Sequence, residues 1–203
     1  ASRQERKLCR MNSKERHELR YQRRKKRRLA RRRELNRLYG DYDKDISITE
    51  LMKAYKICRT NVGWKASVQR YGFNLWKNSL KYHKMLLEGR DTFKGFFQFE
   101  IYERGKKRKI RSIHISERCI EKSLAINSFV PMLKNSLIYD NSASLKGRGT
   151  DYARRRILKH LRSWYHFHGN SGYVIVGDFT SFFDNIAHDV LLGIIDKHFD
   201  DKR

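Results

Sequence analysis

One acidic residue near the C-terminal end of the chain directly follows an apolar run that is typical of a buried strand. Residues 173–177 are mostly β-branched or aromatic, and the chain continues into Asp178 and the pair Phe182-Phe183. Such a strand would deliver one carboxylate to the edge of a sheet, beside a flat aromatic surface. A carboxylate in that position can bind Mg²⁺ and leave part of the metal's coordination shell open for phosphate oxygens and water. The alternative is that Asp178 is a turn residue or a helix cap.

A longer pattern around this aspartate resembles a known motif. It consists of Asp178, Phe182, Phe183, Asp184, Ile186 and His188. The pattern is similar to the first palm motif of reverse transcriptases, above all the bacterial and phage enzymes of the retron, diversity-generating and group II intron types. The resemblance implies that Asp178 and the backbone carbonyl of Phe179 bind catalytic Mg²⁺, for which Mn²⁺ can substitute. It also implies that Phe183 is the steric gate that excludes a ribose 2′-OH.

The charge of the chain narrows the class of partner. The 203 residues carry a net charge of +25, with 39% hydrophobic residues. Such an excess of positive charge favours polyanions, because each phosphate that is neutralised releases condensed counterions. Nucleic acid is therefore the expected partner, and an anionic membrane surface is the weaker alternative. No apolar run approaches the roughly 18 to 20 residues that span a bilayer.

The cysteines bear on the redox compartment. Cys9, Cys58 and Cys119 are odd in number and far apart, which indicates free thiols in a reducing environment. We therefore expect a cytoplasmic protein, and the resemblance implies that it is bacterial or phage-encoded.

The first 40 residues form a basic arm. They hold 17 lysines and arginines against four acids, with only a thin apolar stripe of leucines. The arm is predicted either to be a helix that forms along RNA or against the body of the protein, or to be a disordered tail. Both forms would contact the phosphate backbone with little sequence preference. The expected contacts are Arg23, Arg24, Lys25, Lys26, Arg27 and Arg28.

Residues 41–90 are predicted to be helical, because apolar residues recur there at helical spacing. This region resembles the extension that lies N-terminal to the fingers in group II intron-like reverse transcriptases. Aromatic residues alternate with basic ones, and they suit either of two roles: stacking on bases or filling the core. They include Trp64, Tyr71, Trp76 and Tyr82.

Residues 91–172 begin with a predicted β-hairpin. The first strand covers residues 96–102 and the second covers 107–115, joined by a turn around Gly105. The hairpin carries a cluster of lysines and arginines that suits a triphosphate or a template backbone. The alternative is an edge strand that is protected from aggregation by its charge.

The hairpin and the helix after it resemble the fingers of the same reverse transcriptases. There an arginine that contacts the incoming nucleotide precedes an acid–arginine pair that opens a helix. The resemblance implies that Arg108 and Lys106 bind the dNTP and that Glu117-Arg118 stands for the acid–arginine pair. Arg111 and Arg118 are expected to contact nucleic acid. This helix is predicted to be interrupted near Pro131.

A glycine-containing loop precedes a second basic helix. Lys146 and Arg148 lie before the predicted N-cap Thr150, where they suit a phosphate cradle at a helix N-terminus. The helix after it places Arg155 on its polar face, and Arg155 is expected to contact nucleic acid. The segment resembles the basic loop and helix between fingers and palm, near the template. The pair of histidines in 166–168 is predicted to lie in a polar loop rather than in a metal site.

These patterns predict an α+β fold in four parts. Residues 1–40 are the arm and 41–90 the helical extension. The resemblance implies that residues 91–172 are the fingers and 173–203 the start of a right-hand polymerase palm. It also implies the function of an RNA-directed DNA polymerase, a nucleotidyltransferase of the retroelement and phage-defence type. Its partners would be an RNA template, a DNA or RNA primer, dNTPs and a structured non-coding RNA.

One part of the reverse transcriptase pattern has no counterpart in the sequence. The family needs a second palm motif, a hairpin that carries two adjacent aspartates after an aromatic residue, and no such hairpin is recognisable here. Two-metal phosphoryl transfer needs both carboxylate sources. We therefore expect these 203 residues alone not to polymerise. The alternative function is a non-catalytic RNA-binding protein of a ribonucleoprotein that uses a fingers scaffold.

Overall fold

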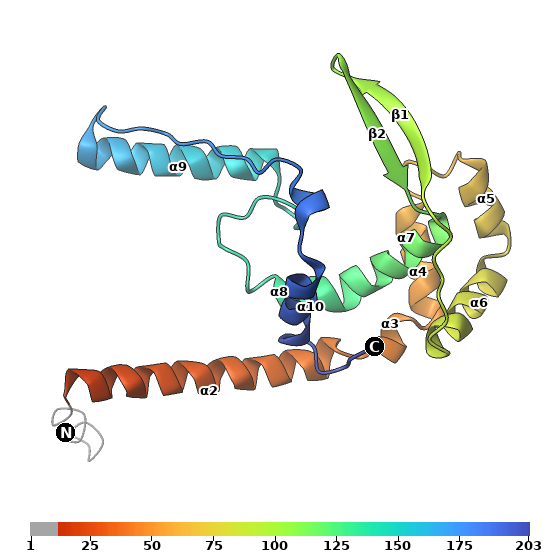
Figure 1. Cartoon of the computed structure of the whole chain (residues 1–203), viewed down its shortest axis with the longest axis horizontal. Coiled ribbons are helices and arrows are strands. Elements are labelled where there is room, and N and C mark those ends of the chain that lie inside the picture. Colours follow the sequence, from red (N-terminus) through yellow and green to blue (C-terminus); the bar gives the residue numbers. More distant parts are fainter. Residues whose placement is uncertain (1–11) are drawn as a thin grey trace.

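The computed structural model describes residues 12–203. Within them the fold is α+β, with a mostly helical body and one two-stranded antiparallel sheet (Figure 1). Residues 1–11 of the predicted basic arm, including Cys9, lie outside the described residues. Within residues 12–203, no helix combines the length and the apolar character that a membrane crossing requires.

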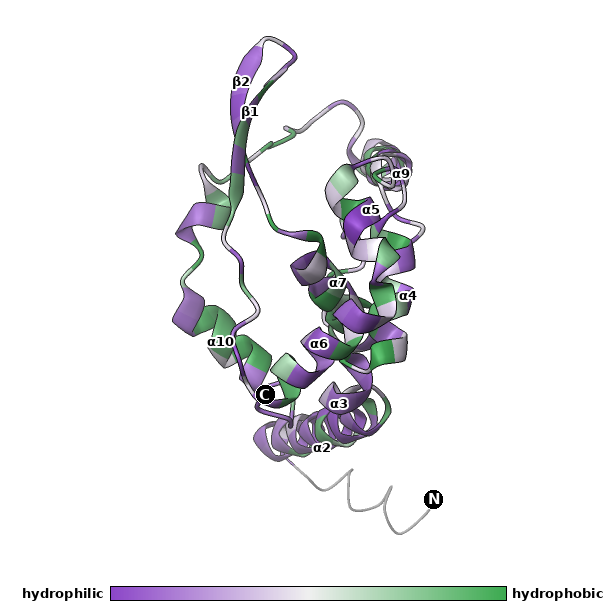
Figure 2. Cartoon of the chain, turned by 90° about the vertical axis from the view of Figure 1, so that its right-hand side faces the viewer, coloured by the Kyte–Doolittle hydropathy of each residue, from purple (hydrophilic) through white to green (hydrophobic). Residues whose placement is uncertain are grey.

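The long basic helix α2 (Ser13–Tyr39) begins at a capping box. The side chain of Asn12 accepts a hydrogen bond from the Glu15 N–H at 2.9 Å, and the Glu15 carboxylate accepts one from the Asn12 N–H at 2.9 Å. No residue of α2 is buried, and the colours of Figure 2 show that the helix is mostly hydrophilic. The helix stops at Gly40, where a Cβ would lie 2.7 Å from the Asn36 carbonyl oxygen.

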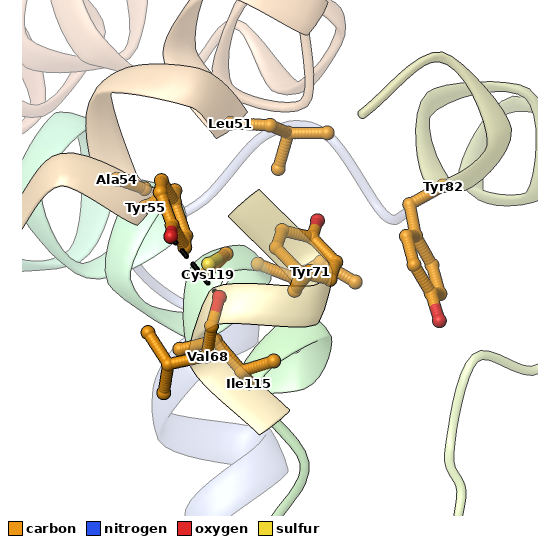
Figure 3. Packing of buried hydrophobic residues seen from close by; sticks show 9 residues of the cluster. Leu51, Ala54, Tyr55, Val68, Tyr71, Tyr82, Ile115 and Cys119 are labelled. Carbon is orange, nitrogen blue, oxygen red and sulfur yellow. Dashed lines mark hydrogen bonds between the residues drawn. The ribbon is translucent and has the colours of Figure 1, made fainter. Parts of the chain in front are cut away.

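The hydrophobic core lies where helices that precede the hairpin in the sequence pack against the helix that follows it. Helix α7 (Ile115–Leu124) contacts α4 (Ile48–Cys58) most extensively, and Figure 3 shows apolar side chains from the body's helices packed around Cys119. The hydroxyl of Tyr55 donates to the Val68 carbonyl at 3.1 Å, so even the polar atom of this buried ring is satisfied. The helices of this body are α4 (Ile48–Cys58), α5 (Ala66–Phe73), α6 (Leu75–Leu87) and α7 (Ile115–Leu124).

The aromatic residues of the helical extension divide between core and surface. Tyr71 and Tyr82 are buried, with ring centroids 6.4 Å apart. Trp64 and Trp76 are 75% and 61% exposed. The core interpretation is therefore correct for the tyrosines, while the tryptophans remain accessible from solvent.

A buried acid joins α2 to this body. Asp45 ends the short helix α3 (Tyr42–Asp45), and its backbone carbonyl accepts a hydrogen bond from the Ser123 hydroxyl at 2.6 Å. The Ser128 hydroxyl contacts both the Asp45 carboxylate and the Tyr39 carbonyl. Burial raises the pKa of Asp45, since the charged form loses hydration there. The end of α2 is thus tied to the segment that follows α7.

The hairpin consists of β1 (Phe97–Glu103) and β2 (Lys106–Ser112), and it projects from the helical body (Figure 1). Its two turn residues, Arg104 and Gly105, have φ values of 50° and 75°. Positive φ at both positions is the backbone shape that matches the twist of a two-residue hairpin. Most residues of both strands are exposed.

The helix after the hairpin changes its hydrogen bonding before the proline. Helix α7 continues through a π-helical turn, Ala125–Phe129, into the short helix α8 (Val130–Leu133). Pro131 has no N–H, so it cannot donate to the preceding turn. The predicted interruption is therefore present, as a π-helical turn just before Pro131 rather than as a break in the chain.

The C-terminal part corrects two predictions about helix α9 (Thr150–His168). The helix includes His166 and His168, which were expected in a loop. Its N-cap position is taken by Gly149 with no side-chain hydrogen bond, so Thr150 is the first helical residue and not the cap. The apolar face of α9 and its basic residues continue at helical spacing to the end, which explains the greater length.

The predicted buried strand at residues 173–177 is also wrong. Within residues 12–203 this segment pairs with no strand, and Tyr173 and Ile175 are 99% and 93% exposed. A strand needs a hydrogen-bonding neighbour, and the apolar pattern alone cannot supply one. The chain then forms a short 3₁₀ turn, Phe182–Asn185, and helix α10 (His188–Asp196).

Candidate nucleic-acid interface and catalytic carboxylate

Asp178 lies at the end of the exposed extended segment, four residues before the start of the 3₁₀ turn. One of its carboxylate oxygens accepts a hydrogen bond from the Phe179 N–H at 2.9 Å. Within residues 12–203, no basic side chain pairs with it. Its second oxygen is therefore open to a ligand from solvent.

The donors at this position suit Mg²⁺ as part of a metal shell only. The Asp178 carboxylate and the Phe179 carbonyl are hard oxygen ligands of the kind that Mg²⁺ takes. However, no group of three or more His, Cys, Asp and Glu that could hold a metal gathers anywhere in the described part of the chain. The two predicted ligands thus supply only part of a shell, which oxygen atoms from water, phosphate or further carboxylates would complete.

The turn after Asp178 presents an aromatic surface. Ser181 adopts a left-handed conformation with φ 50°, and its carbonyl accepts from the side-chain amide of Asn185 at 3.1 Å, which closes the turn. The rings of Phe182 and Phe183 meet edge to face with centroids 5.4 Å apart. Phe183, the predicted steric gate, is 85% exposed. The acid and the aromatic residue are therefore both exposed to solvent within one short segment, residues 178–183.

The two predicted dNTP-binding residues share one face of the hairpin. Lys106 is paired with Glu103, and Arg108 with Ile101, in the antiparallel register. Residues directly opposite each other, or two apart on one strand, point to the same side of a sheet. The Arg108 guanidinium lies 3.3 Å from the Glu103 carboxylate, and both side chains are exposed. Arg111 has the opposite alternation and therefore lies on the other face.

The acid–arginine pair of α7 divides between the interior and the surface. Glu117 is buried, and its carboxylate accepts from the Lys94 N–H at 2.9 Å, which holds the chain leading into the hairpin. Its second oxygen has no hydrogen-bond partner within residues 12–203. Arg118 is exposed and accessible to nucleic acid, whereas its backbone carbonyl accepts from the Cys58 thiol at 3.4 Å.

The predicted phosphate cradle before α9 is organised differently from the expectation. The Arg148 guanidinium lies over the rings of Tyr139 and Tyr152, 5.8 and 4.9 Å from their centroids. It also donates to the carbonyls of Tyr139 and Asn141 at 2.8 and 2.7 Å. Arg148 thus holds the loop against the helix, while Lys146 remains exposed.

A second contact fixes the same loop. Asp140 pairs with Arg156 and lies 2.8 Å from the His160 ring nitrogen. Hydrogen bonds from Arg156 first, and then from His160, lower the pKa of Asp140. The neighbouring Arg155 is exposed on α9 and is therefore available to a ligand.

The two long basic helices extend from the body toward the same side of the molecule. Figure 1 shows α2 and α9 along their lengths, and Figure 2 shows both nearly end-on. The basic run of residues 23–28 is exposed along α2. The structure brings neither this run nor the hairpin into hydrogen-bonding contact with Asp178.

An adjacent pair of aspartates that the sequence analysis did not single out follows α10. Asp200 and Asp201 come directly after Phe199. They lie on no hairpin; Asp200 pairs with Arg32 at 2.6 Å and Asp201 pairs with Arg203 at 2.8 Å. The Asp200–Arg32 pair attaches the segment after α10 to α2, whereas the Asp201–Arg203 pair lies within that segment. The only feature of the sequence that could have drawn attention to these two residues is that they are adjacent and follow an apolar helix.

Comparison of the chain with models of known protein families and with curated proteins found no match.

Proposed function

We propose that the chain is the fingers-bearing part of an RNA-directed DNA polymerase and carries its first metal-binding carboxylate at Asp178. The observation that carries the proposal is the exposed segment 178–183, in which Asp178 and Phe183 are both accessible to solvent and no basic side chain of residues 12–203 is paired with the acid. An acid kept out of internal ion pairs is available to a metal ion and to phosphate oxygens.

The hairpin supports a nucleotide-binding role within this proposal. Lys106 and Arg108 lie on one face of a projecting, exposed ribbon. Two cations on one face suit a triphosphate, because Arg offers a planar fork and Lys a mobile point charge. The exposed lysine and arginine side chains of α2 and α9 would hold the phosphate backbone of the template.

Primer extension tests the proposal. The natural-length protein is given an RNA template, a DNA primer, dNTPs and Mg²⁺, beside its Asp178→Ala and Asp189→Ala variants. Asp189 is an exposed acid in the first turn of α10, so its replacement removes the same charge from a nearby position. We expect Asp178→Ala to lower extension by at least about 100-fold and Asp189→Ala to leave it within about 3-fold. Equal activity of all three proteins would refute the role of Asp178.

A non-catalytic RNA-binding function is the second candidate, and α2 favours it. No residue of this basic helix is fully buried, and its exposed run of residues 23–28 offers its charge to a polyanion. If the wild type adds no nucleotide while the wild type and Asp178→Ala bind RNA equally tightly, the binding function takes the place of the polymerase.

A further inference from the structure

A groove lies between the middle of α2 and the end of the body. Its volume is about 620 Å³, which lies within the range of about 300 to 1,000 Å³ that small-ligand sites occupy. One wall is α2 from Arg28 to Leu35. The other walls come from Met132 of α8, the two residues 135 and 136 after α8, and Lys197 and His198 after α10. Segments far apart in sequence therefore form it.

The walls are held together by direct contacts. The Arg32 guanidinium pairs with the Asp200 carboxylate at 2.6 Å. The side-chain amide of Asn36 donates to the His198 carbonyl at 2.8 Å, and its oxygen accepts from the Asp200 N–H at 2.9 Å. Asn36 thus pairs with the backbone on both sides of Phe199. The groove is fixed by these contacts and does not need a ligand to assemble its walls.

The groove combines an apolar floor with a basic rim. Leu29, Leu35 and Met132 supply the apolar lining, and Met132 is buried. Four basic side chains surround them, and none of the residues that line the groove is acidic. Within residues 12–203, only Arg32 of these four has an ion-pair partner. The three without one are Arg28, Arg31 and Lys197.

We propose that this groove binds one unpaired nucleotide of an RNA strand that follows α2. The base would lie on Leu29 and Leu35, and the adjoining phosphates would contact Arg28, Arg31 and Lys197. Unpaired bases in RNA are commonly held on apolar or planar side chains, including the plane of an arginine, while cations hold the backbone. The choice of RNA as the strand rests on the proposed function.

The chemistry around the groove favours a strand over a small anion. The basic residues of α2 continue from Arg28 back to Arg23, beyond the edge of the groove. One phosphate would occupy the rim only, whereas an extended polyanion contacts the rim and this run together. A bare phosphate chain would leave the apolar floor unused, and a nucleotide covers it.

The test compares two double variants that remove equal charge from the same helix. Arg28→Ala/Arg31→Ala removes two arginines that line the groove, and Arg27→Ala/Arg33→Ala removes two exposed arginines that lie outside it. Binding of a fluorescent single-stranded RNA is measured by anisotropy at several salt concentrations. Both pairs should lower the magnitude of the salt slope by a similar amount, about 0.7 for each lost phosphate contact. We expect the groove pair to weaken binding at least about 10-fold and the outside pair about 2- to 3-fold. Equal losses of RNA affinity in the two double variants would refute the proposal that the groove binds a nucleotide.

A third variant separates base from phosphate. Leu29 is exposed enough to be replaced without loss of core packing, so Leu29→Ser changes the floor and no charge. It should weaken RNA binding about 3- to 10-fold and leave binding of inorganic polyphosphate unchanged. If Leu29→Ser alters neither ligand, or both equally, the groove is part of a general polyanion surface and holds no base.

This outcome is independent of the polymerase assay. Primer extension that persists while the two double variants bind RNA alike would reject the groove and keep the polymerase. Selective loss in the groove pair without any primer extension would keep the nucleotide site in an RNA-binding protein.

Discussion

Replacing Gly72 by alanine should destabilise the helical body, although alanine is the better helix former. A Cβ at this position of α5 would lie 2.1 Å from the Tyr55 hydroxyl oxygen and 2.9 Å from its ring carbon Cζ. Tyr55 cannot swing away at little cost, because it is buried, donates to the Val68 carbonyl at 3.1 Å and packs 5.6 Å from the Tyr71 ring. Overpacking of this kind costs about 1–3 kcal/mol, which exceeds the gain of at most about 1 kcal/mol in helix propensity.

A double-mutant cycle identifies the clash as the cause. Tyr55→Phe alone removes the hydrogen bond to Val68 and should cost about 1 kcal/mol. In Gly72→Ala/Tyr55→Phe the hydroxyl oxygen that would lie 2.1 Å from the new Cβ is absent, and only the contact with the ring carbon Cζ at 2.9 Å remains. The double variant should therefore be more stable than the sum of the single effects predicts, by about 1 kcal/mol.

Urea unfolding followed by circular dichroism measures these differences, and Gly63→Ala provides the control. A Cβ at Gly63 meets only the Arg59 carbonyl oxygen, at 3.4 Å, so its effect should stay within about 0.5 kcal/mol. A Gly72→Ala protein as stable as the wild type would refute the packing argument. Strict additivity in the cycle would show that the cost arises elsewhere than at the Tyr55 hydroxyl.

Two further predictions concern titratable groups of the body. A hydrogen bond with the Cys119 thiol, with help from nearby positive charge, lowers the pKa of Cys58 to about 7, whereas the contact with Cys58 and burial raise the pKa of Cys119. Of these two thiols, Cys58 should therefore react with iodoacetamide first, with a rate that rises through about pH 7, and mass spectrometry should find Cys119 modified only after denaturation. The pKa of Asp45 is raised by burial, so the folded protein holds this proton more tightly than the unfolded chain. The contribution of protonated Asp45 to the free energy of unfolding is fully present below the pKa of the unfolded chain, about 3.9, and is lost as the pH rises through the pKa of the folded protein. Asp45→Asn should flatten the dependence of the urea midpoint on pH in this acid range, and an unchanged slope would contradict the assignment.

Local chemistry made much of the fold predictable. The spacing of apolar residues indicated the helices of residues 41–90, and alternation around Gly105 indicated the hairpin. The predicted strand bounds were close to those observed because the turn residues fix the register locally. The basic character of residues 23–28 and the position of Asp178 beside an aromatic pair were also visible in the sequence.

The failures have a common physical cause. The run at 173–177 has the composition of a strand, but a strand exists only where another segment offers its backbone, and none does within residues 12–203. Arg148 has the composition of a phosphate ligand, yet two tyrosine rings and two carbonyls hold it in the loop.

The sequence by itself determined the elements whose hydrogen bonds and periodicity are local: the helices of the body, and the hairpin with its charged ribbon. It left open whether the basic arm is a helix, which the structure decides with the capped helix α2. The tertiary structure alone decided which lysine and arginine side chains remain accessible to a ligand and which are held by contacts within the protein. It also assembled the groove, where Arg28, Met132 and Lys197 come from three separate segments. Contacts over such separations depend on how whole helices pack, and no pattern within one segment encodes them.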